Sequence, residues 1–262
     1  MNGQRVGAPP WPMVPGWPGS FDFDRFEVLT FDCYGTLIDW EAGILAAARP
    51  ILAQHGVAAD DETILARYAA AEAALEAGPY RPYRAVLGES LARVARDLGV
   101  ELRPDELEAF GGSVRDWPPF ADSVAALAAL RSRYRLGIVT NCDDALFAAS
   151  NAKLGEPFEW VVTAEQVRAY KPDLRPFRVA LQRIGVPAER ILHVAQSLYH
   201  DHVPAKRLGL ATVWVDRRHD RPGWGATPPA EASPDLVVPD LATLADLAGR
   251  TRSEGGAGET RP

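Results

Sequence analysis

The chain has 262 residues, of which 47% are hydrophobic and 24% charged, a balance typical of a globular protein that excludes a collagen-like or low-complexity chain. The formal net charge of -7 argues against a sequence-independent nucleic-acid surface, and only two cysteines, Cys33 and Cys142, exclude a disulfide-rich secreted scaffold. No apolar run approaches the roughly 20 residues that cross a bilayer, and the N-terminus lacks the apolar core of a signal peptide. We therefore expect a soluble cytoplasmic protein that binds neither nucleic acid nor membrane.

The two ends of the chain differ in composition from its middle. Residues 1–22 are rich in proline and glycine, which predicts an irregular N-terminal arm. Residues 250–262 are polar and glycine-rich, which predicts a disordered tail.

Between the ends, short apolar runs alternate with helical patterns. Six runs of three to six residues, rich in β-branched side chains, predict buried strands at 26–31, 136–139, 160–162, 191–194, 212–215 and 236–238. Helical spacing separates several of them, as at Val124, Leu127 and Leu130, and Gly209 follows a short helix as its stop. This alternation predicts an α/β fold, a Rossmann-like doubly wound parallel sheet with helices on both faces.

One stretch, residues 41–113, contains no convincing strand. Asp60 or Asp61 can cap a helix there, and Pro104 can open a later one. Two apolar helical faces support this prediction, one formed by Ile64, Tyr68, Ala71 and Leu75 and the other by Leu87, Leu91, Val94 and Leu98. We expect a helical cap inserted into a discontinuous α/β core, 23–40 and 114–249, where it covers the ligand-binding edge of the sheet. The alternative is an ordinary packing subdomain.

The first predicted strand ends in Phe-Asp-Cys-Tyr-Gly-Thr-Leu, residues 31–37. Burying an aspartate at the end of a strand costs free energy unless its carboxylate is paired or takes part in chemistry. Gly35 lets the chain turn sharply behind it. Asp32 is therefore a candidate nucleophile. Taken alone, such an aspartate is also a common helix cap or turn former.

Three later segments place polar groups where further strands end. Thr140 and Asn141 offer a hydroxyl and an amide, Lys171 stands before a proline, and Ser197 precedes Asp201 by four residues. A lysine can pair with a carboxylate and keep it ionised. Each segment alone is compatible with a turn, a surface loop or a helix cap. The specific feature is the order of these three segments after the segment that contains Asp32.

In this order of motifs the chain resembles the haloacid dehalogenase superfamily over residues 24–248. The resemblance implies that Asp32 is the nucleophile and that Thr140 or Asn141 binds an anionic substrate. It also implies that Lys171 neutralises charge around Asp32 and that Asp201 closes the acidic motif. A helical cap after the first motif belongs to the same pattern, and relatives are often homodimers.

Two positions separate phosphatases from dehalogenases within this superfamily. Phosphatases usually carry an aspartate two residues after the nucleophile, where this chain has Tyr34, and an acidic magnesium ligand where it has Gln196. A hard cation such as Mg²⁺ is bound by negatively charged oxygen ligands, which Gln196 does not supply. A halide leaves without protonation, so a dehalogenase needs no general acid at position 34. The resemblance is therefore closest to the (S)-2-haloacid dehalogenases, which implies a hydrolase that needs neither metal nor cofactor.

The mechanism that follows begins with in-line attack of Asp32 on the halogen-bearing carbon of a short 2-haloalkanoic acid, and water then hydrolyses the ester. Asp201 is the candidate for orienting that water, with Ser197 and Lys171 holding the two aspartates. The substrate carboxylate and halide sites are expected to be lined by Thr36, Tyr34, Thr140 and Asn141.

Dehalogenases of this type also place a cap arginine near the halide. Arg67 is the first candidate here, with Arg84 and Arg81 as competitors. The chain departs from the pattern at Leu198, Tyr199 and Phe177, where those enzymes carry asparagine or tyrosine. Two alternatives therefore stay open, a Mg²⁺-dependent phosphatase of the same fold and a family member with weak or no turnover.

Overall fold

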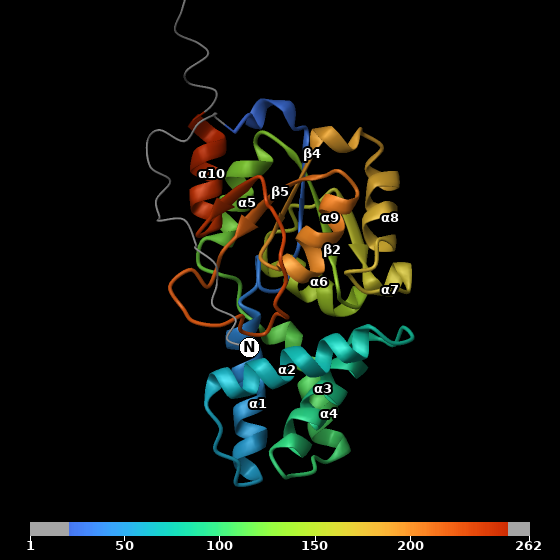
Figure 1. Ribbon diagram of the computed structural model, residues 1–262, viewed down its shortest axis with the longest axis vertical. Coiled ribbons are helices and arrows are strands. Elements are labelled where there is room, and N and C mark those ends of the chain that lie inside the picture. The colour runs from blue at the N-terminus through green and yellow to red at the C-terminus, as the bar shows by residue number, and fades with distance from the viewer. Residues whose placement is uncertain (1–20, 251–262) are drawn as a thin grey trace, which may run out of the picture.

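The computed structural model describes residues 21–250 and contains one six-stranded sheet in which every strand pairs in parallel (Figure 1). The strands are β1 (Val28–Phe31), β2 (Arg135–Thr140), β3 (Trp160–Thr163), β4 (Ile191–Ala195), β5 (Ala211–Val215) and β6 (Leu236–Val238). All six predicted strands are confirmed, with ends that differ by at most two residues.

The strands lie in the order β3-β2-β1-β4-β5-β6, so the chain winds outward from β1 in one direction and then returns to add β4 on the other side. The order reverses between β1 and β4. Ligands of open α/β sheets bind at such a switch point, outside the carboxyl ends of the strands. The doubly wound fold is therefore confirmed, and the topology itself marks the edge where a site is expected.

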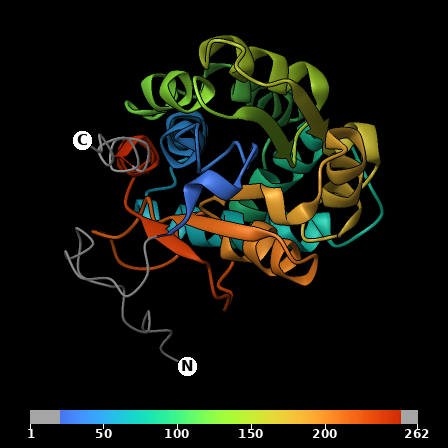
Figure 2. The same ribbon diagram turned by 90° about the horizontal axis from the view of Figure 1, so that it is seen from above.

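Helices cover both faces of the sheet (Figure 2). Strand residues alternate between the two cores: Leu29 packs with α5 (Ser123–Arg131), α6 (Asp144–Lys153) and α10 (Leu241–Arg250), whereas Val28 packs with α8 (Arg175–Ile184) and α9 (Val203–Arg207). Both faces of a parallel sheet are buried, which explains why its strands are almost wholly apolar. Shorter turns of helix complete the core at Phe23–Arg25, Ser113–Asp116, Ala164–Val167 (α7), Ala188–Arg190 and Leu198–His202.

The inserted region forms four helices that lie together beyond one end of the sheet (Figure 1). They are α1 (Trp40–Gln54), α2 (Asp61–Glu76), α3 (Tyr83–Asp97) and α4 (Pro104–Gly112). Asp60 caps α2, accepting a hydrogen bond of 2.8 Å from the Thr63 amide, as its sequence position predicts. The helical cap is confirmed. Its first helix, α1, was not indicated by either of the two apolar faces seen in the sequence.

An ion-pair cluster, which we call the Arg218 clasp, joins the cap to the core. The guanidinium of Arg218, in the segment after β5, is buried and binds Glu41 of α1, and its Nη2 lies 2.6 Å from Glu62 Oε1 of α2. Gly225 lies close beside this cluster with a φ of +59°, where an added Cβ would stand 1.7 Å from Glu41 Oε1. Only glycine fits there, because any side chain would displace the clasp.

The predicted irregular arm, apart from residues 21 and 22, and the predicted tail beyond residue 250 fall outside the described residues. Among residues 21–250 no helix is both long and apolar enough to traverse a bilayer.

Candidate active site

Asp32 lies at the carboxyl end of β1, at the switch point of the sheet, and is buried. Gly35 turns the chain behind it with a φ of +89°. The hydroxyl of Thr36 donates a hydrogen bond of 2.6 Å to Asp32 Oδ2 and accepts one of 2.9 Å from the amide of Gln196, after β4. Thr36 therefore acts on the carboxylate and ties the loops after the two central strands together.

Lys171 supplies the positive charge next to Asp32. Its Nζ lies 2.9 Å from Asp32 Oδ1, 2.7 Å from Asp201 Oδ1 and 2.9 Å from the carbonyl oxygen of Val139. These three acceptors use all three protons of the ammonium group. The lysine is thus a fixed cation shared by two carboxylates.

Asp201 is held from the sheet side as well. His193 Nε2 lies 3.0 Å from Asp201 Oδ1, and His193 Nδ1 lies 2.9 Å from the hydroxyl of Thr30 on β1. The other oxygen of Asp201, Oδ2, has no hydrogen-bond partner within residues 21–250. One carboxylate oxygen is therefore anchored and the other is free to accept a bond from water or substrate.

The pKa values of Asp32 and Asp201 are shifted in opposite directions. Burial raises the pKa of Asp32 above its usual value, with the charge of Lys171 opposing and that of Asp201 adding to the rise. Burial also opposes ionisation of Asp201, but Lys171 and the His193 hydrogen bond prevail and lower its pKa. Burial disfavours the charge of Lys171 too, but its two carboxylate neighbours outweigh that cost and raise its pKa. Asp201 is the firmly ionised member of the pair.

The side-chain hydroxyl of Ser197 bonds to His200 rather than to either aspartate. Its Oγ lies 3.1 Å from His200 Nδ1 and accepts a bond of 2.9 Å from the His200 amide. The expected support of Asp32 and Asp201 by the Ser197 side chain is therefore corrected, since the hydroxyl serves as the cap of the next turn. Burial lowers the pKa of His200 to about 4, so this imidazole is neutral, and its Nε2 lacks a hydrogen-bond partner in the described chain.

Of Thr140, the last residue of β2, and Asn141, which follows it, only Asn141 reaches the pocket. Its Nδ2 donates to Glu76 Oε2 at 3.1 Å and to the Lys171 carbonyl oxygen at 3.0 Å, and its Oδ1 accepts from the Lys171 amide at 2.7 Å. Thr140 is buried one residue earlier and does not line the pocket. Side chains of a strand alternate between faces, so the expected substrate contact of Thr140 is corrected.

Tyr34 lines the pocket with its ring, while its hydroxyl is bound elsewhere. The hydroxyl lies 3.0 Å from Ser150 Oγ and accepts a bond from Cys142 Sγ at 3.3 Å. Burial raises the pKa of this phenol well above its ordinary value. Tyr34 can therefore supply an apolar wall but no proton.

The cap wall of the pocket is acidic, which the sequence reasoning missed. Glu72 and Glu76 of α2 both line the pocket, and Glu72 Oε1 accepts hydrogen bonds from Tyr68 at 2.7 Å and from Tyr83 at 2.8 Å. Glu76 Oε2 lies 3.5 Å from His200 Nε2. Tyr68, Glu72 and Glu76 follow one another at four-residue spacing, so both glutamates lie on the side of α2 that Tyr68, a member of the predicted apolar face, marks as buried.

Burial governs the titration of both glutamates. It raises the pKa of Glu72 to about 7, with the two tyrosine hydrogen bonds opposing the rise. Burial and the charge of Glu72 raise the pKa of Glu76 well above its ordinary value, with Lys171 opposing. Burial therefore favours the protonated, neutral form of Glu76.

The structure does not bring the predicted cap arginines to the pocket. Arg67 is half-buried and pairs with Asp97, 3.5 Å away, and Arg84 is exposed and pairs with Glu108, 3.6 Å away. Arg81 is exposed as well and is not among the pocket's lining residues. The expected arginine contact with a leaving halide is corrected for all three, because helix geometry turns Arg67 and Arg84 to the outside of the cap.

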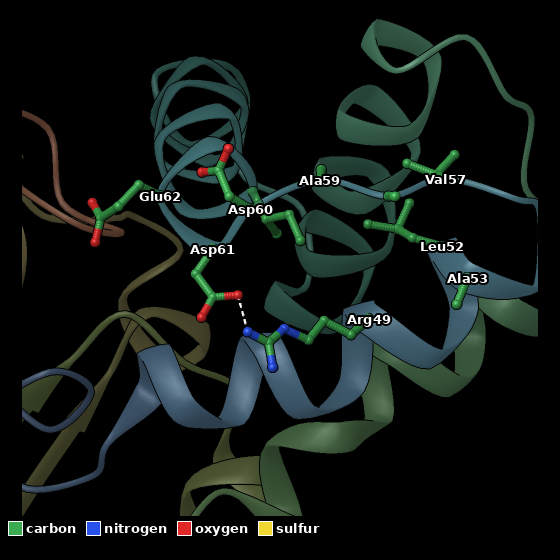
Figure 3. A pocket seen from close by; sticks show the side chains of 10 residues that line it. Arg49, Leu52, Ala53, Val57, Ala59, Asp60, Asp61 and Glu62 are labelled. Carbon is green, nitrogen blue, oxygen red and sulfur yellow. Dashed lines mark hydrogen bonds and ion pairs between the residues drawn. The ribbon is translucent and has the colours of Figure 1, made fainter.

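The pocket around Asp32, which we call the inner pocket, has a cavity volume of about 30 Å³. It is lined by Asp32, Tyr34, Trp40, Glu72, Glu76, Tyr83, Asn141, Lys171, Ser197, His200 and Asp201. A larger hollow of about 570 Å³ lies within the cap, between α1 and the start of α2 (Figure 3). There Arg49 pairs with Asp61, and no residue is shared with the inner pocket.

The residues of the inner pocket do not fit a magnesium ion. The ammonium of Lys171 stands between the carboxylates of Asp32 and Asp201. The third position of such a site is Gln196, whose side-chain Oε1 accepts a bond of 3.1 Å from Thr227 instead of lining the pocket. A hard dication needs more negative oxygen than this arrangement leaves unbound.

Comparison with known proteins agrees with this geometry. The sequence model of the haloacid dehalogenase-like hydrolases matches residues 26–207. An (S)-2-haloacid dehalogenase of Pseudomonas fluorescens is 26% identical over 82% of this chain and 93% of its own length. A phosphoserine phosphatase of Thermus thermophilus is 36% identical, over 63% of this chain and 64% of its own.

A solved structure is similar over nearly its whole length. The L-2-haloacid dehalogenase of Xanthobacter autotrophicus with chloropropionic acid covalently bound has a TM-score of 0.72 at 21% identity, over 86% of this chain and 99% of its own. At that identity the likeness supports the fold. Since the family match spans most of the chain and contains all four motif segments, this protein belongs to the haloacid dehalogenase-like hydrolases.

Proposed function

We propose that the protein is a hydrolytic dehalogenase of 2-haloalkanoic acids that works through an ester on Asp32 and without a metal. The observation that carries the proposal is the position of the Asp32 carboxylate and the set of groups around it. The carboxylate lies at the switch point, its two oxygens are oriented by Lys171 and Thr36, and a tyrosine stands at the position of the phosphatase general acid. The similarity to (S)-2-haloacid dehalogenases supports the same chemistry.

In the first step an Asp32 oxygen attacks the halogen-bearing carbon, the carbon–halogen bond breaks, and the halide leaves with the electron pair. Lys171 keeps Asp32 ionised and near the reacting carbon. Holding the acid in line with the nucleophile supplies roughly 7–11 kcal/mol of the barrier in favourable cases.

In the second step water attacks the carbonyl carbon of the ester, releases the hydroxy acid and regenerates Asp32. Asp201 Oδ2, whose sister oxygen is anchored by Lys171 and His193, is the acceptor that orients this water. One oxygen of water thereby enters the Asp32 side chain.

The oxygen transfer gives the decisive experiment. Single turnover of 2-chloropropionate in ¹⁸O-labelled water, with excess enzyme, should place the heavy oxygen in the peptide that contains Asp32, detected by mass spectrometry. Asp32→Asn should release no halide while it keeps the wild-type circular dichroism. Halide release with no label in that peptide would disprove the ester.

A Mg²⁺-dependent phosphatase is the second candidate, favoured by the 36% identity to a phosphoserine phosphatase over 171 residues. Phosphate release from a panel of phosphoesters, lost on addition of EDTA, would establish it. Halide release that is insensitive to EDTA would establish the dehalogenase.

A further inference from the structure

A carboxylate that is buried in the inner pocket needs hydrogen-bond donors there. The three protons of the Lys171 ammonium already go to two aspartates and a backbone carbonyl oxygen. Both protons of the Asn141 side-chain amide are used as well, one by Glu76 and one by the Lys171 carbonyl oxygen. The cap arginines lie elsewhere. An anionic substrate therefore depends on a donor that no contact within the protein occupies.

His200 carries a ring nitrogen of this kind. Its side chain lines the inner pocket and is only 8% exposed, and within residues 21–250 its Nε2 has no hydrogen-bond partner. Glu76 Oε2 lies 3.5 Å from this nitrogen, beyond the usual length of a hydrogen bond, and already accepts one from Asn141. A buried polar atom that lacks a partner at the wall of a pocket marks a place for a ligand atom.

The hydrogen bonds of Ser197 decide which ring nitrogen of His200 carries the proton. Ser197 Oγ accepts a bond of 2.9 Å from the His200 amide and lies 3.1 Å from His200 Nδ1. The hydroxyl proton has no other acceptor within the described residues, so it is donated to Nδ1. Burial lowers the pKa of His200 to about 4, so at neutral pH the ring has a single proton. Because Nδ1 is an acceptor, that proton belongs on Nε2.

The groups next to this imidazole suit an anion. The Tyr199 ring meets the imidazole edge to face, with ring centres 4.8 Å apart, and together with the Ser197 bonds it holds the ring. Burial favours the protonated form of Glu76, and in that form the neighbouring carboxyl does not repel an anion beside Nε2. The pocket therefore contains a fixed N–H donor that bears no charge of its own.

We propose that the Nε2–H of His200 donates a hydrogen bond to the carboxylate of the bound acid, and that Ser197 orients this donor by keeping Nδ1 an acceptor. A hydrogen bond to an ionised acceptor is stronger than one between neutral groups, so a single imidazole N–H contributes substantially to binding. The identity of the reacting carbon rests on the proposed function, whereas the binding of a short carboxylic acid does not.

Calorimetric titration of the full chain with propionate, which has no halogen and cannot react, tests the donor alone. His200→Phe keeps a ring but removes both nitrogens, and it should weaken binding by about tenfold or more. His200→Gln places an amide N–H near the position of Nε2 and should restore most of the affinity. His55→Phe, at a cap histidine that pairs with Glu106, is the matched control and should bind as the wild type does. Wild-type affinity in His200→Phe, or no binding of propionate by the wild type, would overturn the proposal.

The position of the ring proton has a readout of its own. In the chain labelled with ¹⁵N-histidine, the chemical shifts of the two ring nitrogens show which one carries the proton, and His200→Gln identifies the signals by their loss. We expect the proton on Nε2, and a shift of that nitrogen signal on addition of propionate. A proton on Nδ1 would overturn the proposal even if His200→Phe failed to fold.

Halide release separates this proposal from the proposed function. His200→Phe should raise KM for 2-chloropropionate and for 2-bromopropionate by the same factor, because both acids carry the same carboxylate. A fall in kcat that is larger for the chloro acid, with unchanged binding of propionate, would place the N–H at the leaving halide and overturn the carboxylate contact. Weaker binding of propionate by His200→Phe, with no halide release from either acid by the wild type, would keep the donor and reject the dehalogenase.

Discussion

Lys171 Nζ lies 2.9 Å from Asp32 Oδ1 and donates to Asp201 as well, so the candidate nucleophile shares this cation with a second carboxylate. Replacing Lys171 by methionine leaves two buried carboxylates side by side, and a proton then binds to the one with the higher pKa, Asp32. We expect halide release to fall by roughly 10²–10³-fold and stability to fall by about 3–5 kcal/mol. Lys206→Met, at an exposed ion pair with Asp235, is the matched control. A Lys171→Met enzyme with near wild-type turnover would show that Asp32 does not need this cation.

The raised pKa of Glu76 predicts a pH dependence of substrate binding. Burial favours the protonated carboxyl, and its ionisation as the pH rises adds a negative charge to the pocket that contains Asp32. KM for a haloacid should therefore rise with pH through the pKa of Glu76, and Glu76→Gln should remove this rise. Glu108→Gln, at an exposed carboxylate of α4, should keep the wild-type profile. If the Glu76→Gln enzyme retained the same rise in KM, the effect would belong to another group.

Glu72 predicts a dependence of stability on pH. Its folded pKa of about 7 lies above its ordinary value of 4.5, so the native state binds more protons between these values and stability falls as pH rises from 4.5 to about 7. In the Glu72→Gln variant the amide oxygen can accept the same two tyrosine hydrogen bonds without a charge. This substitution should therefore raise Tm near pH 8 relative to its effect near pH 5, by about 2–4 °C per kcal/mol recovered. Thermal unfolding at the two pH values measures this, and an equal shift at both would count against an ionising Glu72.

The outward placement of the cap arginines predicts that they are dispensable. Arg67→Ala and Arg84→Ala should each leave kcat/KM within about twofold of wild type, because both side chains are paired away from the pocket. Halide release at several substrate concentrations measures this. A loss of tenfold or more in either variant would mean that the cap rearranges during turnover.

Most of the core could be predicted from the sequence because local pattern and topology agree there. Short β-branched runs separated by helices leave few alternatives to a parallel sheet, and the carboxyl ends of its strands must meet at one edge. Asp32, Lys171 and Asp201 follow from that rule together with the family resemblance, and the structure places the lysine within hydrogen-bonding distance of both aspartates.

The side chains of the cap could not be predicted in the same way. Successive residues of a helix differ by about 100° in direction, so a displacement of one position exchanges inside for outside. The side chain of Arg67 is 39% exposed and points away from the pocket, whereas Tyr68, the next residue, is fully buried. Thr140 and Asn141 differ likewise at the end of a strand. The acidic wall was missed because a buried glutamate contradicts the usual preference of charged groups for solvent.

The Arg218 clasp is one of two polar ties between α2 and the core. Glu62, in its first turn, is bound to the core through Arg218, whereas Glu76, its last residue, lines the inner pocket and accepts a hydrogen bond of 3.1 Å from Asn141. Breaking the clasp would expose a buried guanidinium and leave Glu41 uncompensated. Both ends of α2 are therefore tied to the core by polar contacts, the first turn through Arg218 and the last through Asn141, so any movement of the cap away from the core must break one of them.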